Sequence, residues 1–160
     1  MSDPLTIQIE VQADEAIKTL TRLADGIRDP RLMERIGAEV VTFSQERILS
    51  GKNTAPDGSR WEPLAMSTIL RKRKKGFGGQ GTLVQRGHLW STIVAANATA
   101  DGVDIGSTCV YAMIHQKGGK TGRGHKTTIP ARPYIGVSQD EELVLQRWIG
   151  RWVKDLLEEG

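Results

Sequence analysis

Three stretches with helical spacing of apolar residues, two near the N-terminus and one near the C-terminus, limit the folds open to this chain. Near the N-terminus the spacing runs over residues 16–27 and again over 32–48, and near the C-terminus it runs over 145–156. Side chains three or four residues apart share one face of an α-helix, so each stretch predicts an amphipathic helix that packs against a core.

The ends of these helices carry recognisable capping residues. Asp14 is a suitable N-cap for the first helix, and Asp29 followed by Pro30 is typical of the start of the second. Ser138 and Glu141 have the spacing of a capping box, in which each side chain bonds the other residue's backbone amide. These signals predict helices at both ends of the chain.

Strand and turn signals occupy the remaining sequence. Residues 5–11 alternate apolar and polar, which predicts a half-buried strand. Residues 83–99 read as a helical turn that passes into a strand, Asp101-Gly102 predicts a hairpin turn, and 127–129 form a short strand that Pro130 ends. The expectation is one α+β domain over residues 1–160, with a small antiparallel sheet flanked by N-terminal helices and a long C-terminal helix.

Composition excludes several classes of protein. The chain has 160 residues, a net charge of +3 and one cysteine, Cys109, which excludes an internal disulfide. No apolar run reaches the length of a membrane span, and the first residues lack the pattern of a signal peptide. We therefore expect a protein of cytoplasmic origin with no membrane partner.

Candidate catalytic and cofactor motifs fail on spacing. Gly76, Gly78 and Gly81 match a dinucleotide-binding pattern, but a basic run precedes them instead of a buried strand. Gly119-Lys120-Thr121 lacks the earlier glycine of a phosphate loop. The histidines have no metal-ligand spacing, and His115 beside Gln116 is more typical of a buried or interfacial pair than of a general base. We expect no enzyme activity, no metal and no cofactor.

The strongest charge feature is the basic run Arg71, Lys72, Arg73, Lys74 and Lys75, which follows a short helix that Ser67 can cap. One interpretation is a solvated helix end, where cations suit the helix dipole. The other is a basic surface that contacts phosphate or an acidic partner. Both interpretations of the basic run stay open. Because the second would let the run bind phosphate, a small nucleic-acid-binding module is the alternative function.

Four motifs in order resemble those of a known family. They are P-x-G-x-x-W-x-P-L from Pro56, G-x-L from Gly87, Y-A-x-x-H-Q from Tyr111 and I-P-A-R-P-Y-I-G from Ile129. Each is weak alone, but the ordered set, with the capped C-terminal helix, resembles the phage virion morphogenesis family, or tail completion proteins, of Mu-like and related tailed phages. The resemblance covers nearly the whole chain.

The resemblance implies a structural role without catalysis. Such proteins are thought to act in tail completion and head-to-tail joining at the virion neck. It implies a ring of identical subunits, a hexamer by the symmetry of the tail, with neighbouring neck, tail tube or tail terminator proteins as partners. Contact with DNA in the lumen is open.

We assign expected subunit contacts to two groups of residues. Trp61 lies in a loop and packs on its own core or on a partner, with its own core favoured. Lys117 to Lys126 is rich in glycine and cations, so we expect a long loop or hairpin tip that is mobile in a free subunit and orders against a neighbour. The expected contact residues are Trp61, His115, Gln116, Lys117, Lys120, Arg123, Arg132 and Tyr134.

Overall fold

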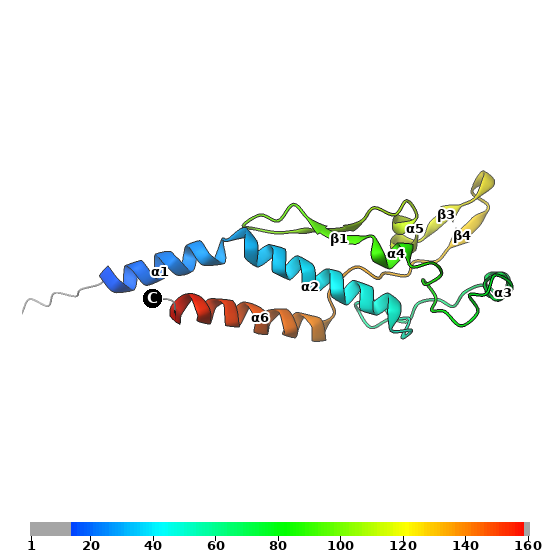
Figure 1. The fold of residues 1–160 in the computed structure, drawn as a ribbon. Helices are drawn as coiled ribbons and strands as arrows, with labels where there is room; N and C mark the ends of the chain where they lie inside the picture. Colours follow the sequence, from blue (N-terminus) through cyan, green and yellow to red (C-terminus); the bar gives the residue numbers. More distant parts are fainter. Residues whose placement is uncertain (1–13, 159–160) are drawn as a thin grey trace, which may run out of the picture.

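The computed structural model describes residues 14–158 (Figure 1). The strand predicted at residues 5–11 lies outside the described residues. The elements follow in the order α1 (Asp14–Ile27), α2 (Pro30–Leu49), α3 (Met66–Lys74), α4 (His88–Ser91), β1 (Ile93–Ala96), β2 (Asp104–Ser107), α5 (Ala112–Lys117), β3 (Gly119–Thr121), a 3₁₀ turn (Arg123–His125), β4 (Thr127–Ile129) and α6 (Gln139–Glu158). The predicted α+β class, with helices at both ends, is confirmed.

Helix α2 is the central element of an elongated molecule. It contacts the β1–β2 ribbon and α4, and it also contacts α6. Figure 1 shows the ribbon and α6 on different sides of α2, with α1 continuing beyond its N-terminus. At the opposite end of the molecule, α3 and the β3–β4 hairpin extend past the helices.

The start of α2 follows the predicted capping pattern. The Asp29 carboxylate accepts a hydrogen bond from the backbone N–H of Arg31 at 2.9 Å, and Pro30 occupies the first turn. Further along, a Cβ on Gly37 would lie 2.9 Å from the side chains of Ala95 and Val103. The absence of a side chain at Gly37 therefore lets the β1–β2 ribbon pack closely on α2.

The strands form two separate antiparallel ribbons. In the first, Ile93 pairs with Ser107 and Ala96 with Asp104, which confirms the predicted hairpin. In the second, β3 pairs with β4 over residues 119–129. Of the two forms predicted for Lys117 to Lys126, a long loop or a hairpin tip, the structure shows the hairpin tip, because Gly122 and Gly124 adopt positive φ and allow the tight return that brings the two strands together.

The core lies between the C-terminal half of α2 and the segments that follow it. Its buried apolar side chains come from α2, the loop after it, α4, β1, α5 and the segment before α6: Ile48, Ala55, Trp61, Leu89, Ile93, Ala112 and Tyr134. The predicted packing of Trp61 on its own core is confirmed, since its side chain is 5% exposed.

Helix α6 begins with the predicted capping box. The Ser138 N–H donates to the Glu141 carboxylate at 2.7 Å, and the Glu141 N–H donates to Ser138 Oγ at 3.4 Å. The predicted apolar stripe of α6 is half-buried along its whole length. Two tryptophans in it contact the first two helices: the Arg35 guanidinium lies 4.3 Å from the Trp148 ring centroid, and Trp152 Nε1 donates to the Gly26 carbonyl at 3.1 Å.

A buried arginine joins α2 to the start of α6. The Arg47 side chain is 7% exposed, and its Nη1 donates to the carbonyls of Tyr134 (2.7 Å) and Gly136 (3.2 Å). Its Nη2 donates to the Glu141 carboxylate, the same group that caps α6. Loss of the Arg47 side chain would remove the donor from all of these acceptors at once. Arg47 therefore holds α2, residues 134–136 and the start of α6 in place.

Replacing Arg47 by Met is expected to lower the free energy of unfolding by about 3–5 kcal/mol, because Glu141 is left without its buried counter-charge. Glu141→Gln should cost less, since Arg47 keeps its two carbonyl acceptors. Urea unfolding of both variants measures this, with Lys154→Met, from the exposed Lys154–Glu158 pair, as the control. Equal stability of Arg47→Met and the control would contradict the assignment.

Candidate functional site

Two of the sequence motifs interlock through side chains that bond to backbone carbonyls. The Trp61 indole Nε1 donates to the Pro133 carbonyl at 2.9 Å. In the opposite direction, the Arg132 guanidinium donates to the carbonyls of Glu62 (2.9 Å) and Pro63 (3.1 Å). Each segment thus contributes one large side chain to the other.

A third motif joins them through Gln116. Its Oε1 accepts from the N–H groups of Tyr134 (3.0 Å) and Ile135 (3.1 Å), and its Nε2 donates to the Ile135 carbonyl at 3.0 Å. The His115 carbonyl accepts from the Arg132 N–H at 2.7 Å. We call these contacts the motif junction; it joins residues 61–63, 115–116 and 132–135.

The motif junction lies inside the single chain. Tyr134 is 0% exposed, Arg132 is 4% exposed and Trp61 is comparably buried. Burial raises the pKa of the Tyr134 hydroxyl to about 12, so it stays protonated. These three side chains expose little surface that a neighbouring subunit could contact. Their role in subunit contacts stays a prediction, and their burial does not favour it.

His115 lies beside the motif junction, half-buried, with its ring edge against Tyr111. Burial, with a smaller contribution from the nearby Arg132 charge, lowers the pKa of the imidazole. Its Nδ1 is buried without a hydrogen-bond partner in the described part of the chain. The Gln116 side chain bonds to Tyr134 and Ile135 and not to the His115 imidazole.

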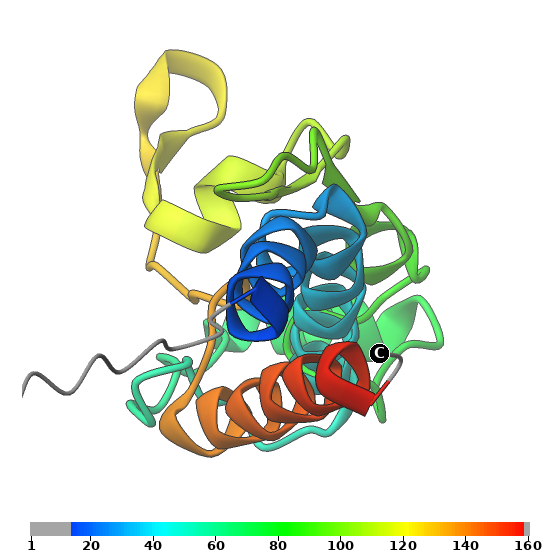
Figure 2. The ribbon, with the colours of Figure 1, turned by 90° about the vertical axis from the view of Figure 1, so that its left-hand side faces the viewer.

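The cations expected at subunit contacts lie on or beside the β3–β4 hairpin. Lys117, Lys120 and Arg123 are all exposed. Figure 2, seen along the molecule, shows this hairpin standing away from the helices. Of the expected contact residues, these three have exposed side chains in the described chain.

The basic run divides into one buried and four exposed cations. Lys72 is 8% exposed, and its Nζ donates to the carbonyls of Gln80 (3.3 Å), Gly81 (2.7 Å) and Val84 (2.9 Å). Burial lowers the pKa of this ammonium group. The prediction that Lys72 belongs to the basic surface is wrong, because its charge is used to hold the loop after α3.

The helix that carries the run also begins differently from the prediction. The N-cap position of α3 is Ala65, and no side chain caps the helix, so the prediction of Ser67 as cap is wrong. The C-terminal end fits the expectation, since Arg71, Arg73 and Lys74 place exposed cations in the last turn, where the helix dipole favours them.

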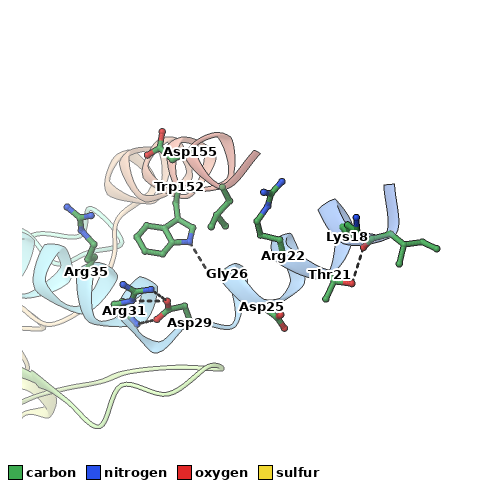
Figure 3. A pocket seen from close by; sticks show the side chains of 12 residues that line it. Lys18, Thr21, Arg22, Asp25, Gly26, Asp29, Arg31, Arg35, Trp152 and Asp155 are labelled. Atoms are coloured by element: carbon green, nitrogen blue, oxygen red, sulfur yellow. Dashed lines mark hydrogen bonds and ion pairs between the residues drawn. The ribbon is translucent and has the colours of Figure 1, made fainter. Parts of the chain in front are cut away.

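Two clefts open on the surface at opposite ends of the molecule. The larger, about 840 Å³, lies where α1 meets the start of α2 and the C-terminal part of α6, with Trp152 on one wall and Arg22 on another (Figure 3). The smaller, about 400 Å³, lies among α3, residues 82–89 and α5. Arg71, Lys75 and Arg86 line this second cleft.

Sequence reasoning did not identify the Arg47–Glu141 pair or the role of Lys72. The capping-box spacing of Glu141 was visible, but nothing in the sequence assigned its second partner from a helix more than 90 residues away. Lys72 is one of five adjacent cations, and its side chain differs from theirs only in the direction in which it leaves the helix. The glycine-rich segment after α3 was the available signal, because such a segment leaves carbonyls in need of donors.

Comparisons with known proteins assign the chain to a group of phage proteins. Residues 11–154 match the sequence model of the phage virion morphogenesis family. The chain is 42% identical over 145 residues to the Mu-like prophage FluMu G protein 2 of Haemophilus influenzae, with 88% of this chain and 91% of that protein covered. It is 28% identical over 143 residues to the putative capsid assembly protein G of Escherichia phage Mu, with 89% of each chain covered.

No solved structure matches the chain. Within residues 14–158, no helix has both the length and the apolar character needed to cross a membrane.

Replacing Lys72 by Met is expected to destabilise the protein by about 1–3 kcal/mol, because the buried carbonyls of the loop lose their donor. Lys74→Met on the same helix removes an exposed cation and should have little effect. Thermal or urea unfolding of the two variants compares them directly. If both variants unfold like the parent protein, the Lys72 ammonium does not hold the loop.

The lowered pKa of His115 predicts a pH-dependent stability. Since an unperturbed imidazole has a pKa of 6.5, the unfolded chain takes up this proton before the folded one as pH falls. The stability of the fold with a neutral His115 is fully present above pH 6.5. It is lost as the pH falls from 6.5 toward the pKa of His115 in the folded protein.

The matched pair of variants is His115→Gln and His125→Gln, the latter on the exposed hairpin. Urea unfolding at about pH 7.5 and about pH 5 should show a smaller loss of stability for His115→Gln than for the parent. His125→Gln should retain the parent's loss. An unchanged loss in His115→Gln would exclude the assignment.

Proposed function

Because the chain belongs to the phage virion morphogenesis family, we propose that it is a structural protein of the virion that completes the tail and joins it to the head, assembled as a hexameric ring. The observation that carries the morphogenesis role is the family match, which extends over residues 11–154. The tail, the neck and the ring are the finer parts of the proposal.

The chemistry of the motif junction supports a structural role. Its polar side chains, from Trp61, Gln116 and Arg132, direct their donors and acceptors to backbone groups of the same chain. A group that acts on a substrate must leave its reactive atoms open to that substrate. We therefore propose that the shared motifs specify the subunit fold and that the protein is not an enzyme.

Helix α1 is the surface that we assign to contact with a second copy. Its main contacts within the chain are with α6. Ile17 is 56% exposed, Leu20 66% and Ile27 47%, so the apolar side of an amphipathic helix remains largely uncovered. A helix of 14 residues is marginal by itself and gains most of its stability from burying such a face.

A ring requires that the surface of one subunit fit a different surface of the next. The cleft of about 840 Å³ beside α1 includes Ile17 of this helix, has Trp152 and Leu156 on its α6 side, and is otherwise lined mainly by charged side chains (Figure 3). We propose that a second copy covers α1 and this cleft together. Virion partners of the assembled ring would be the neighbouring neck, tail tube or tail terminator proteins.

Replacing Leu20 by Glu is expected to abolish self-association without lowering the melting temperature of the monomer, because the side chain is exposed in one chain. The control is Val110→Glu, at a position 97% exposed on another part of the surface. Light scattering after size-exclusion chromatography measures the mass of each variant. A parent protein that stays monomeric at high concentration, or an assembly that Leu20→Glu leaves intact, would contradict the α1 assignment.

The role in the virion is tested by deleting the gene from a phage that carries it and imaging the particles. We expect full heads separated from tails, or tails with an unfinished upper end, and joined particles when the gene is supplied from a plasmid. Virions that remain joined and infectious after the deletion would exclude the tail-completion role, while defective heads would place the protein in another step of morphogenesis.

A further inference from the structure

Acidic residues are absent from two long segments of the chain. Residues 63–100 and 105–139 contain none of the 19 aspartates and glutamates but half of the 22 lysines and arginines. The net charge of +3 conceals this separation, because the remaining segments carry all the acidic residues. Positive charge is therefore concentrated in the parts of the chain that form α3, its following loop and the β3–β4 hairpin.

The fold brings these parts to one end of the molecule. Figure 1 shows α3 and the β3–β4 hairpin at the end opposite to α1. We call α3, residues 82–88 and the hairpin the basic end. The cleft of about 400 Å³ among α3, residues 82–89 and α5 carries Arg71, Lys75 and Arg86, two threonine hydroxyls from Thr68 and Thr82, and no carboxylate.

The cations of the basic end are available to a ligand. Arg71, Lys75 and Arg86 are exposed, as are Lys120, Arg123 and Lys126 of the hairpin. Within residues 14–158, the ion pairs involve other residues, so no carboxylate of the described chain neutralises these six. Lys72 is separate from them, because its ammonium is occupied by the loop carbonyls.

This arrangement fits a repeating polyanion better than a folded acidic protein. The six cations lie on separate elements around and beside an open cleft, and the hairpin offers no exposed aliphatic or aromatic side chain. Protein interfaces rely on buried apolar or aromatic anchors, whereas nucleic-acid backbones are bound largely through dispersed lysines and arginines. The exposed Met66 and Leu70 on α3, with the exposed Tyr111 in the cleft, are the features that would serve an acidic protein instead.

We propose that the basic end binds the phosphate backbone of a nucleic acid without reading its sequence. Arg71, Lys75 and Arg86 provide the cleft contacts, and the hairpin cations extend them along the strand. Threonine hydroxyls and the glycine-rich backbone of the hairpin add hydrogen-bond donors that suit phosphate oxygens. This binding does not depend on the tail-completion role and remains testable if that role is wrong.

The experiment uses the full chain and a fluorescently labelled DNA duplex of about 20 base pairs, with anisotropy measured at several salt concentrations from about 50 to 200 mM. One variant carries Arg71→Ser, Lys75→Ser and Arg86→Ser; a second carries Lys120→Ser, Arg123→Ser and Lys126→Ser. The control carries Arg147→Ser, Arg151→Ser and Lys154→Ser, which removes the same charge from exposed positions on α6.

We expect the parent protein to bind with an affinity that falls steeply with salt. Each basic-end variant should reduce the slope of log affinity against log salt by about 2–3 and weaken binding at least about tenfold at low salt. The control should bind nearly as the parent does. Circular dichroism of each variant confirms that a loss of binding does not come from unfolding.

Three results would overturn the proposal. The first is no binding to DNA even at low salt. The second is an equal loss in the control variant, which would mean that only net charge matters. The third is tighter binding to poly-glutamate than to the duplex at matched charge concentration, which would identify the basic end as a surface for an acidic protein.

Discussion

The bond network of Arg47 connects the helical part of this molecule to the segment that carries its most specific motif. One guanidinium binds backbone carbonyls on both sides of Ile135 and the carboxylate that caps α6. The orientation of α6 along α2 and the position of residues 132–136 are thus set by the same side chain. Since residues 132–136 also hold the loop around Trp61 and the end of α5, a displacement of Arg47 would spread to most of the core.

The residues that stabilise the fold and the surfaces assigned to partners lie in different parts of the molecule. The motif junction and Arg47 occupy the middle of the molecule and are buried. The surfaces assigned to partners lie at its two ends: the uncovered apolar side of α1 at one, and the exposed cations around the smaller cleft at the other. A protein that is placed between different neighbours in an assembly benefits from this division, because each end can change without disturbing the core.

Helix-capping and turn residues were enough to predict the helices and the β1–β2 hairpin. The other features of the structure depend on contacts between residues far apart in sequence. Asp29-Pro30 and the Ser138–Glu141 pair act within one turn of helix, so their spacing in sequence is enough to predict the structure. The β3–β4 hairpin stayed one of two alternatives, because its glycines also fit a long loop until the pairing of β3 with β4 is known. Lys72 could not be distinguished from its neighbours, since only the position of the following loop makes it buried.

The separation of charge along the molecule has a consequence for how it approaches other molecules. At one end of this elongated body the exposed cations have no carboxylates among them, while the segments elsewhere carry charges of both signs, so the positive potential is strongest at the basic end. In the field of a negatively charged surface, such a body turns before contact, so that its basic end arrives first. Each copy would then meet that surface in the same orientation, and polarity would be established during diffusion, before any short-range contact had formed.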